Sequence, residues 1–441
     1  MNKLKSFLRS FSLCLIVVAG IVAWTALPWP VLLALAVLFA LWMLLARSGR
    51  QAGSVTRVGV STLPQRLGAS SVVVIGIAGV VAVLVSMLAM GAGYQQTLGR
   101  SGSADTAIVL RGGSASEVSS VLDNASTTVI AQAPGIARDA AGKPIASPEL
   151  VVAANLPLND GSGDEGSVQM RGVGEQAWTL RPEVKIVSGR KFKPGLRELV
   201  VGKGAQRQFA GLAPGREIKL GSQVWTVAGV FESGNAMDSE LWGDSNVVAD
   251  TYRRGSSRTS VFVRLTSPAA YDAFKAALAA DPRLQVDTST TLDYFRKQSE
   301  GVTKAITIIG IVVGVIMAIG AVFGALNTMF ATVATRAREI ATLRAIGFRG
   351  LPVVVAVMLE TMLLALLGGL VGGALAWLVF NGYSASTLAQ GTVGTLSFKL
   401  AVTPALLWTG LKWALAIGFI GGLFPAVRAA RLPVTTALRE L

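Results

Sequence analysis

Long apolar runs divide the chain into segments of membrane-spanning length. A helix needs about 20 largely apolar residues to cross the hydrocarbon core of a bilayer, and five runs are long enough. The first, residues 11–46, has room for two helices and is interrupted at Pro28, Trp29 and Pro30, so it predicts a hairpin of two short spans. The fold class predicted is an α-helical transmembrane bundle, with a four-span core after this hairpin. The core runs are Val72–Met90, Ala305–Val333, Leu351–Phe380 and Leu400–Val427.

The basic residues of the loops predict the orientation of these spans. Lys and Arg accumulate on the cytoplasmic side, close to span ends. Residues 1–70 contain seven basic side chains and no acidic one, the loop 334–350 contains four Arg and one Glu, and the tail after residue 427 contains three Arg and one Glu. Six spans place all of these segments, with both termini, in the cytoplasm. Residues 95–301 and 381–399 are then expected outside.

The external segment 95–301 reads as a folded domain. Its 23 basic and 22 acidic side chains nearly cancel, and short β-like runs alternate with turns, which is typical of strands. Two helices are predicted, at Ala115–Leu122 and Pro268–Ala280, so we expect a large α+β domain. The predicted strands are Ala107–Leu110, Thr127–Ala131, Leu150–Ala153, Val168–Met170, Val184–Val187, Leu199–Val201, Gln223–Val230 and Ser260–Leu265.

Composition excludes several classes of function. The chain is 52% hydrophobic and 15% charged, and it has no histidine and one cysteine, so histidine-based catalysis and the usual metal sites are not available. The phosphate-loop pattern GxxxxGK followed by Ser or Thr is absent from the sequence. The net charge of +15 lies mostly in segments flanking the membrane, which disfavours nucleic acid as a partner. We therefore expect a non-catalytic membrane chain with no cofactor or metal of its own.

A basic amphipathic segment follows the second core span. Ile340 and Leu343 share one helical face, and Gly347 is placed to end the helix as a C-terminal cap. The pattern predicts a short helix lying along the cytoplasmic surface, which binds either a protein partner or anionic lipid. The candidate site residues are Arg336, Arg338, Glu339, Ile340, Leu343, Arg344 and Gly347.

With this segment, the chain resembles the MacB/FtsX-type permeases of ABC transporters. The family run V-x-E-R-x-R-E-I-G-x-L-R-A-x-G is matched at Val333–Gly347, although Thr335 and Ala341 stand where the family commonly has Glu and Gly. The resemblance covers roughly residues 55–441, and the hairpin lies outside the usual four-span plan. Further matches are Leu359 and Glu360, the glycines Gly368, Gly369, Gly372 and Gly373, the ending Pro425–Arg439, and Ile186–Lys191, Glu198–Lys203, Pro214–Leu220 and Val224–Phe231 in the external domain.

The resemblance implies a permease subunit of the bacterial inner membrane. It implies that a separate ATPase subunit binds ATP and Mg, docks on the helix Arg336–Gly347, and drives movement of the periplasmic domain, called mechanotransmission, for export or efflux. A second permease copy or paralogue and a periplasmic adaptor are further expected partners. The implied domains are 1–54 (hairpin and linker), 55–94 (first core span), 95–301 (MacB-like periplasmic core) and 302–441 (FtsX-like, three spans).

Polar and small residues within the predicted spans leave alternatives open. Glu360 reaches either the interface or another helix, and Lys412 can snorkel to the interface. The pairs Gly368/Gly372 and Gly369/Gly373 permit close helix packing, within the chain or across a dimer. With so few intramembrane charges, a secondary transporter is disfavoured. A membrane signalling or regulatory protein acting through its periplasmic domain remains the alternative function, and the sequence does not indicate a substrate.

Overall fold

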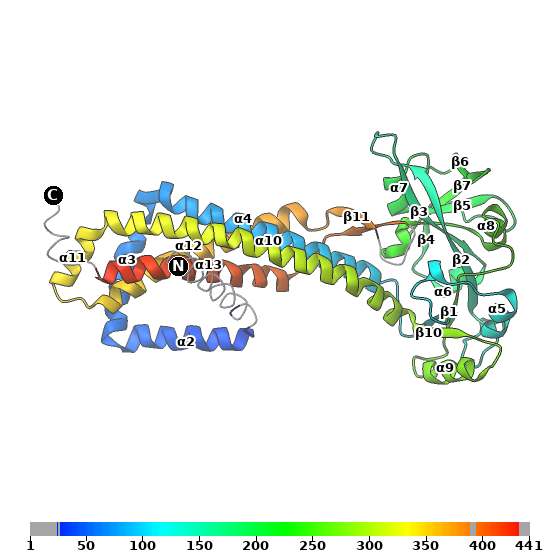
Figure 1. Ribbon diagram of the computed structural model, residues 1–441, viewed down its shortest axis with the longest axis horizontal. Helices are drawn as coiled ribbons and strands as arrows, with labels where there is room; N and C mark the ends of the chain where they lie inside the picture. Colours follow the sequence, from blue (N-terminus) through cyan, green and yellow to red (C-terminus); the bar gives the residue numbers. More distant parts are fainter. Residues whose placement is uncertain (1–23, 25–26, 389–393, 432–441) are drawn as a thin grey trace, which may run out of the picture. The chain divides into compact units, whose positions relative to one another are not determined.

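The computed structural model describes residues 24, 27–388 and 394–431. The chain divides into two compact units, each considered on its own (Figure 1). The helical unit comprises Met1–Ala89, Ile306–Asn381 and Val402–Leu441, and the sheet unit comprises Met90–Ala305 and Gly382–Ala401. The predicted external segment 95–301 thus falls within the sheet unit, which also takes in residues assigned by sequence to the C-terminal domain.

Each predicted core span corresponds to one continuous helix, although the last helix begins at Pro404 and not at Leu400. The structure has four helices that are long and apolar enough to cross a membrane among the residues it describes. β-branched residues do not prevent helix formation here, because a backbone in lipid must satisfy its own hydrogen bonds. The helices α4 and α10 extend beyond the predicted spans and run from the helical unit into the sheet unit. The bounds are α4 Leu67–Gly99, α10 Thr291–Thr335, α12 Gly350–Phe380 and α13 Pro404–Arg431.

The N-terminal segment departs from the prediction after its second arm, and the hairpin itself is only partly described. Its first arm, residues 11–23, lies outside the described residues, and its second arm is helix α2 (Trp29–Leu45). The predicted loop after it is instead helix α3 (Arg47–Ser61), followed by the turn η1 (Leu63–Arg66). α2 and α3 meet at 95° and together count as at most one further span. α3 forms because its small residues pack on α12 while its arginines stay exposed.

The glycines of α12 pack against helices of the same chain. A Cβ atom at Gly368 would lie 2.9 Å from Val74 O of α4, and one at Gly372 would lie 2.9 Å from Ala78 Cα. On the other side, a Cβ at Gly369 would lie 2.8 Å from Ala414 Cβ of α13. The α12 helix is therefore held between α4 and α13 by these glycines, so this small-residue packing is within the chain.

Replacing Gly372 with alanine should destabilise the helical unit by about 1–3 kcal/mol, because the added Cβ has no space beside α4. Gly320 of α10 is the matched control, since a Cβ there would meet nothing within 4 Å. Thermal unfolding of the detergent-solubilised chain measures both variants. Equal stability of Gly372→Ala and Gly320→Ala would contradict the packing described.

The sheet unit is built on one ten-stranded mixed sheet with strand order β10-β1-β9-β2-β3-β8-β5-β7-β4, and β6 pairs with β7. The pairs β3–β8 and β5–β7 are parallel, and the other strand pairs of this sheet are antiparallel. The strands are β1 Thr106–Arg111, β2 Ala146–Pro157, β3 Glu165–Val173, β4 Lys185–Gly189, β5 Glu198–Gly202, β6 Glu217–Leu220, β7 Gln223–Glu232, β8 Glu240–Asp244, β9 Ser260–Arg264 and β10 Val286–Thr290.

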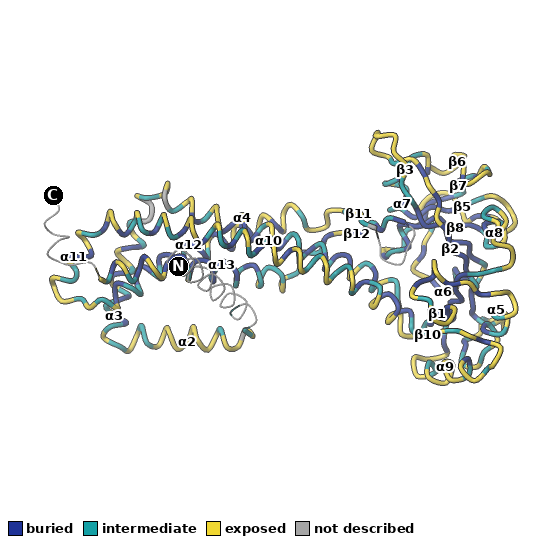
Figure 2. The backbone as a smooth tube through the Cα atoms, viewed as in Figure 1, coloured by how far each residue is buried: buried dark blue, intermediate teal, exposed yellow. Residues whose placement is uncertain are grey.

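Helices complete the α+β architecture that the sequence predicts. Separate apolar cores lie along the sheet, one centred on β1 and β9 with α5 and α9, the others on β2, β3, β5, β7 and β8 (Figure 2). The helices and turns are η2 Glu117–Ser119, α5 Asn124–Ala131, α6 Gln176–Leu180, α7 Lys203–Gln208, η3 Ala236–Ser239, α8 Ser245–Thr251 and α9 Ala270–Ala280.

Some predicted elements are corrected. Thr127–Ala131 is helical, not a strand, because the Asp123 side chain caps the helix by accepting from Ser126 N. The helix predicted at Ala115–Leu122 shrinks to the single turn η2. The segment 381–399 carries a hairpin, β11 (Ser384–Leu388) and β12 (Thr395–Lys399). The hairpin joins the sheet unit, where Ser397 N donates to Ser239 Oγ over 2.9 Å.

Candidate functional site

The predicted amphipathic segment is helix α11, Ala337–Ala345, between α10 and α12. Ile340 is buried in an apolar cluster with Val333 of α10 and Val357 of α12. Leu343 on the same face is half-buried. The helix ends at Ala345, and Gly347, whose φ of 104° suits glycine, lies just beyond it, where Phe348 N donates to Leu343 O over 3.1 Å. The apolar face and the cap are therefore where the sequence places them.

An ion pair holds the start of α11 against α12. Arg336 is 8% exposed, and its Nη1 donates to Glu360 Oε2 over 2.9 Å, while its Nε donates to Glu339 Oε2 over 3.0 Å. Glu360 is 3% exposed, and its carboxylate makes the polar contact with another helix segment that was one of the two expected roles. Arg336 thereby leaves the set of exposed basic residues that the sequence suggested for partner contact.

Helix α3 covers this ion pair. A Cβ atom at Gly59 would lie 3.3 Å from Glu360 Oε2 and 3.4 Å from Arg336 Nη1. The buried face of α3 consists of small or medium residues, Gly49, Ala52, Val55 and Gly59. A glycine at this position lets the α3 backbone approach the ion pair without displacing either side chain. The ion pair is therefore the point at which α3 meets α11 and α12.

The other predicted site residues are distributed around this point. Arg338 and Glu339 are exposed on α11, and Arg344 is half-buried. Lys412 lies on α13 near the level of Gly369, because a Cβ at Gly369 would lie 3.0 Å from Leu411 Cδ1. The backbone O of Lys412 accepts a bond from Trp24 Nε1 over 3.1 Å. The structure therefore groups Arg336, Glu339 and Glu360, and it places Lys412 elsewhere.

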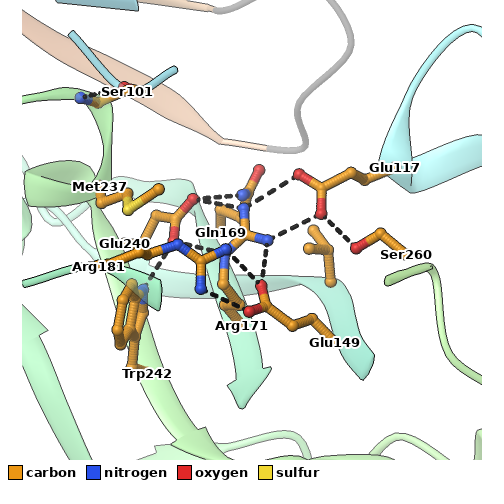
Figure 3. A network of polar contacts seen from close by, with 12 residues as sticks. Ser101, Glu117, Glu149, Gln169, Arg171, Arg181, Met237, Glu240, Trp242 and Ser260 are labelled. Carbon is orange, nitrogen blue, oxygen red and sulfur yellow. Dashed lines mark hydrogen bonds and ion pairs between the residues drawn. The ribbon is translucent and has the colours of Figure 1, made fainter. Parts of the chain in front are cut away.

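The sheet unit contains a second polar site that sequence reasoning missed. Arg171 of β3 is 1% exposed and donates to three carboxylates (Figure 3). Its Nη1 lies 2.8 Å from Glu117 Oε1 and 2.9 Å from Glu149 Oε2, and its Nε lies 2.8 Å from Glu240 Oε2. We call Glu117, Glu149, Arg171, Arg181 and Glu240 the buried ion network. The one signal in the sequence is a charged residue at Arg171 between Met170 and Val173, in the buried half of a strand.

The network is fully paired. Arg181 donates to Glu149 through Nη1 over 2.5 Å and Nη2 over 3.0 Å, and its Cζ lies 4.4 Å from the Phe262 ring centroid. Burial alone would raise the pKa of Glu149, but the charges of Arg181 and Arg171 outweigh it and hold that pKa below its ordinary value. This carboxylate therefore contributes stability above the ordinary pKa of a glutamic acid, and the contribution is lost as the pH falls through its lowered pKa.

The two long helices are bonded to the sheet unit beside this network. Glu117 N donates to Tyr294 Oη, near the start of α10, over 3.2 Å. Ser101, which follows α4, accepts from Ala236 N over 3.0 Å. The start of α10 is thus bonded to η2, and the segment after α4 is bonded to η3, and both turns contain or adjoin network residues.

Metal binding finds no support in the part of the chain that the structure describes. Within it, no group of three or more His, Cys, Asp or Glu side chains is arranged to hold an ion. The buried ion network pairs its carboxylates with arginines instead.

Comparisons with known proteins agree with the two units. Residues 70–281 match the family model of the MacB-like periplasmic core domain, and residues 311–434 match that of the FtsX-like permease C-terminal region. The Macrolide export ATP-binding/permease protein MacB of Bordetella avium (strain 197N) is 28% identical over 395 residues, covering 83% of this chain and 57% of that protein. The chain thus spans little more than half the length of this relative.

Two shorter matches complete the comparison. The Uncharacterized ABC transporter permease YknZ of Bacillus subtilis (strain 168) is 31% identical over 133 residues, covering 30% of this chain and 31% of that protein. The crystal structure of the periplasmic region of MacB from Actinobacillus actinomycetemcomitans aligns at a TM-score of 0.32 and 14% identity, covering 46% of this chain and 92% of that structure. The two family models together cover about three quarters of the chain, and the chain belongs to the MacB/FtsX-type permeases of ABC transporters.

Proposed function

We propose that this chain is the membrane subunit of an ABC transporter, coupling ATP hydrolysis by a separate ATPase subunit to movement of its external domain. The observation that carries the proposal is α11, a short helix with Arg338 on its exposed side, held by the buried Arg336–Glu360 pair directly after α10. An exposed arginine on a surface helix suits charge-assisted bonds to carboxylates of a partner. A helix anchored in this way moves together with α10 and α12.

The length of α10 supports a lever. At 1.5 Å per residue, its 45 residues extend about 67 Å. One end leads into α11, and the other carries Tyr294, which accepts a bond from Glu117 N. A displacement of α11 is then delivered to η2 and the buried ion network. Mechanotransmission requires this transfer of movement to the external domain, and it does not require a channel through the helices.

The ATPase is proposed to be a separate subunit, and the phosphate-loop motif that it would carry does not occur in this sequence. ATP and Mg would be bound there. The relatives are named for both ATP binding and permease activity, and this chain spans only part of their length. Their names also refer to macrolide export, which supports export or efflux as the purpose here. A closing pair of ATPase subunits needs two docking helices, so the complex includes a second permease copy or a paralogue, and a periplasmic adaptor is a further partner.

The proposed orientation in the bacterial inner membrane places α3 and α11 in the cytoplasm and the sheet unit in the periplasm. With Cys14 replaced, a cysteine introduced at Ser162, in an exposed loop, should react with a membrane-impermeant thiol reagent in intact cells. A cysteine introduced at Ser48 of α3 should react only after the cells are opened. The reverse labelling pattern would refute the orientation.

The function is tested by recruitment of the ATPase. In the double variant Arg338→Glu, Arg344→Glu, we expect the ATPase encoded beside this chain to co-purify at least tenfold less, because both changes put negative charge on the docking helix. The control variant Arg197→Glu, Arg216→Glu makes the same change in net charge on exposed residues of the sheet unit. It should leave the amount of co-purified ATPase unchanged. Recruitment that survives the α11 reversal would favour the signalling or regulatory alternative.

A further inference from the structure

We propose that α3 is the second wall of the ATPase docking site, and that a large apolar side chain of the ATPase, flanked by carboxylates, inserts between α3 and α11. The inference rests on the proposed function and extends it from α11 to α3, a helix that the sequence patterns had assigned to a loop. It starts from a cavity that the described residues of α3, α11 and α12 enclose on three sides.

The cavity has a volume of about 400 Å³ and apolar walls. Val55 and Val58 contribute from α3, Ile340 and Leu343 from α11, and Val353, Ala356 and Val357 from α12. The paired Arg336 and Glu360 also line it. Because these two charges already pair with each other, an apolar group can enter the cavity without leaving a buried charge unpaired.

The mouth of the cavity coincides with the exposed side of α11. Arg338 and Thr342 line the cavity, lie one helical turn apart and are both exposed. Across from them, Val58 of α3 is 53% exposed. A partner that docks on the exposed side of α11 therefore also covers Val58. This continuity with the proposed docking helix favours the ATPase as the occupant.

Charge complements this arrangement. Arg47, Arg50 and Arg57 lie on one exposed stripe of α3, opposite its buried face, and α3 contains no acidic residue. Together with Arg338, they favour an acidic partner surface around the inserted apolar group. Anionic phospholipid shares this charge preference, and the experiment below separates it from the ATPase.

The cavity is held open by the contacts around it. The Arg336–Glu360 pair fixes α11 on α12, and the close approach of Gly59 fixes α3 over the pair. A site that is already formed costs little ordering on binding. Val58 then acts as a contact residue, and Arg336, Glu360 and Gly59 act as positioning residues.

Val58→Trp fills the cavity from its rim and tests the inference. Affinity for the neighbouring-gene ATPase, measured in detergent micelles and in nanodiscs of neutral lipid, should fall about tenfold, a typical loss at an interface hot spot. The matched control is Ser54→Trp, which adds the same bulk to an exposed residue of α3 one turn away, outside the cavity lining. It should bind within about twofold of the unmodified chain.

A second measurement does not depend on tolerance of tryptophan. In a variant with Cys14→Ser and Val58→Cys, bound ATPase should slow reaction of the introduced thiol with a maleimide at least tenfold, as expected for a residue buried at an interface. Unchanged labelling would overturn the inference. So would normal ATPase affinity of Val58→Trp, if the Arg338/Arg344 reversal still loses recruitment. Either result leaves the proposed function standing. Normal affinity of Val58→Trp with less co-purified anionic lipid would assign the cavity to lipid and equally overturn it. Normal recruitment by the Arg338/Arg344 reversal would refute the proposed function itself.

Discussion

Replacing Arg171 with leucine should destabilise the sheet unit by about 3–5 kcal/mol, the usual result of removing one partner from a buried ion pair. The substitution leaves the buried carboxylates of Glu117 and Glu240 without their cation. Glu149 still has Arg181, so its share of the loss is smaller. The damage should centre on η2, β2, β3 and β8, where the network residues lie (Figure 3).

Arg190→Leu is the matched control for Arg171→Leu. Arg190 also pairs with a glutamate, since its Nη1 lies 2.6 Å from Glu198 Oε2, but its side chain is 52% exposed. The hydrogen bond from Arg190 lowers the pKa of Glu198 to about 2. Solvent screens such a pair, and its loss should cost no more than about 1 kcal/mol. Hydrogen exchange of the full-length chain in detergent measures both variants, and equal effects would show that the buried ion network does not stabilise the unit.

Replacing Glu360 with leucine should have the second-largest effect, a loss of about 3 kcal/mol in the helical unit and release of α11 from α12. The change leaves Arg336 buried beneath Gly59 with only the exposed Glu339 as partner. A charge without its partner inside a helical bundle is costly. Thermal unfolding of the solubilised chain measures the stability, and ATPase stimulation in the complex measures the coupling.

Two further variants separate the ion pair from general damage. Glu339→Leu removes the other partner of Arg336. Because the Glu339 side chain is 53% exposed, the loss of stability should be less than about 1 kcal/mol. The double variant Arg336→Leu, Glu360→Leu should recover most of the stability, because an apolar pair can replace a buried ion pair. If the double variant is as unstable as Glu360→Leu, the ion pair is not what holds α11.

Hydropathy predicts the core helices well because lipid leaves a spanning backbone few alternatives. It misses α3, whose arginines resemble a cytoplasmic loop while Gly49, Ala52 and Gly59 carry too little hydrophobicity to reveal a buried face. Thr127–Ala131 misleads in another way, since its β-branched residues favour a strand until the cap at Asp123 decides for a helix. The local sequence pattern therefore predicts secondary structure correctly in long apolar segments. It fails where small residues form the buried face of a helix or where a capping side chain determines the conformation.

The candidate sites are predictable only where their residues are neighbours in sequence. Ile340, Leu343 and Gly347 follow from helical spacing, and the structure places them accordingly. The pairing of Arg336 with Glu360, 24 residues apart, depends on how α12 returns along α11. The buried ion network is more remote still, because Arg171 meets Glu117 and Glu240 at separations of 54 and 69 residues. Such contacts follow from tertiary packing, which periodicity does not encode.

In the proposed mechanism, work done at α11 reaches the sheet unit through α10. The most direct measurement is hydrogen exchange of residues 113–120 and 291–299 in the complex with its ATPase, reconstituted in nanodiscs, with and without ATP. We expect ATP to change exchange at both segments, because Tyr294 and Glu117 link α10 to η2. Unchanged exchange there, while the bound ATPase hydrolyses ATP, would contradict this mechanism.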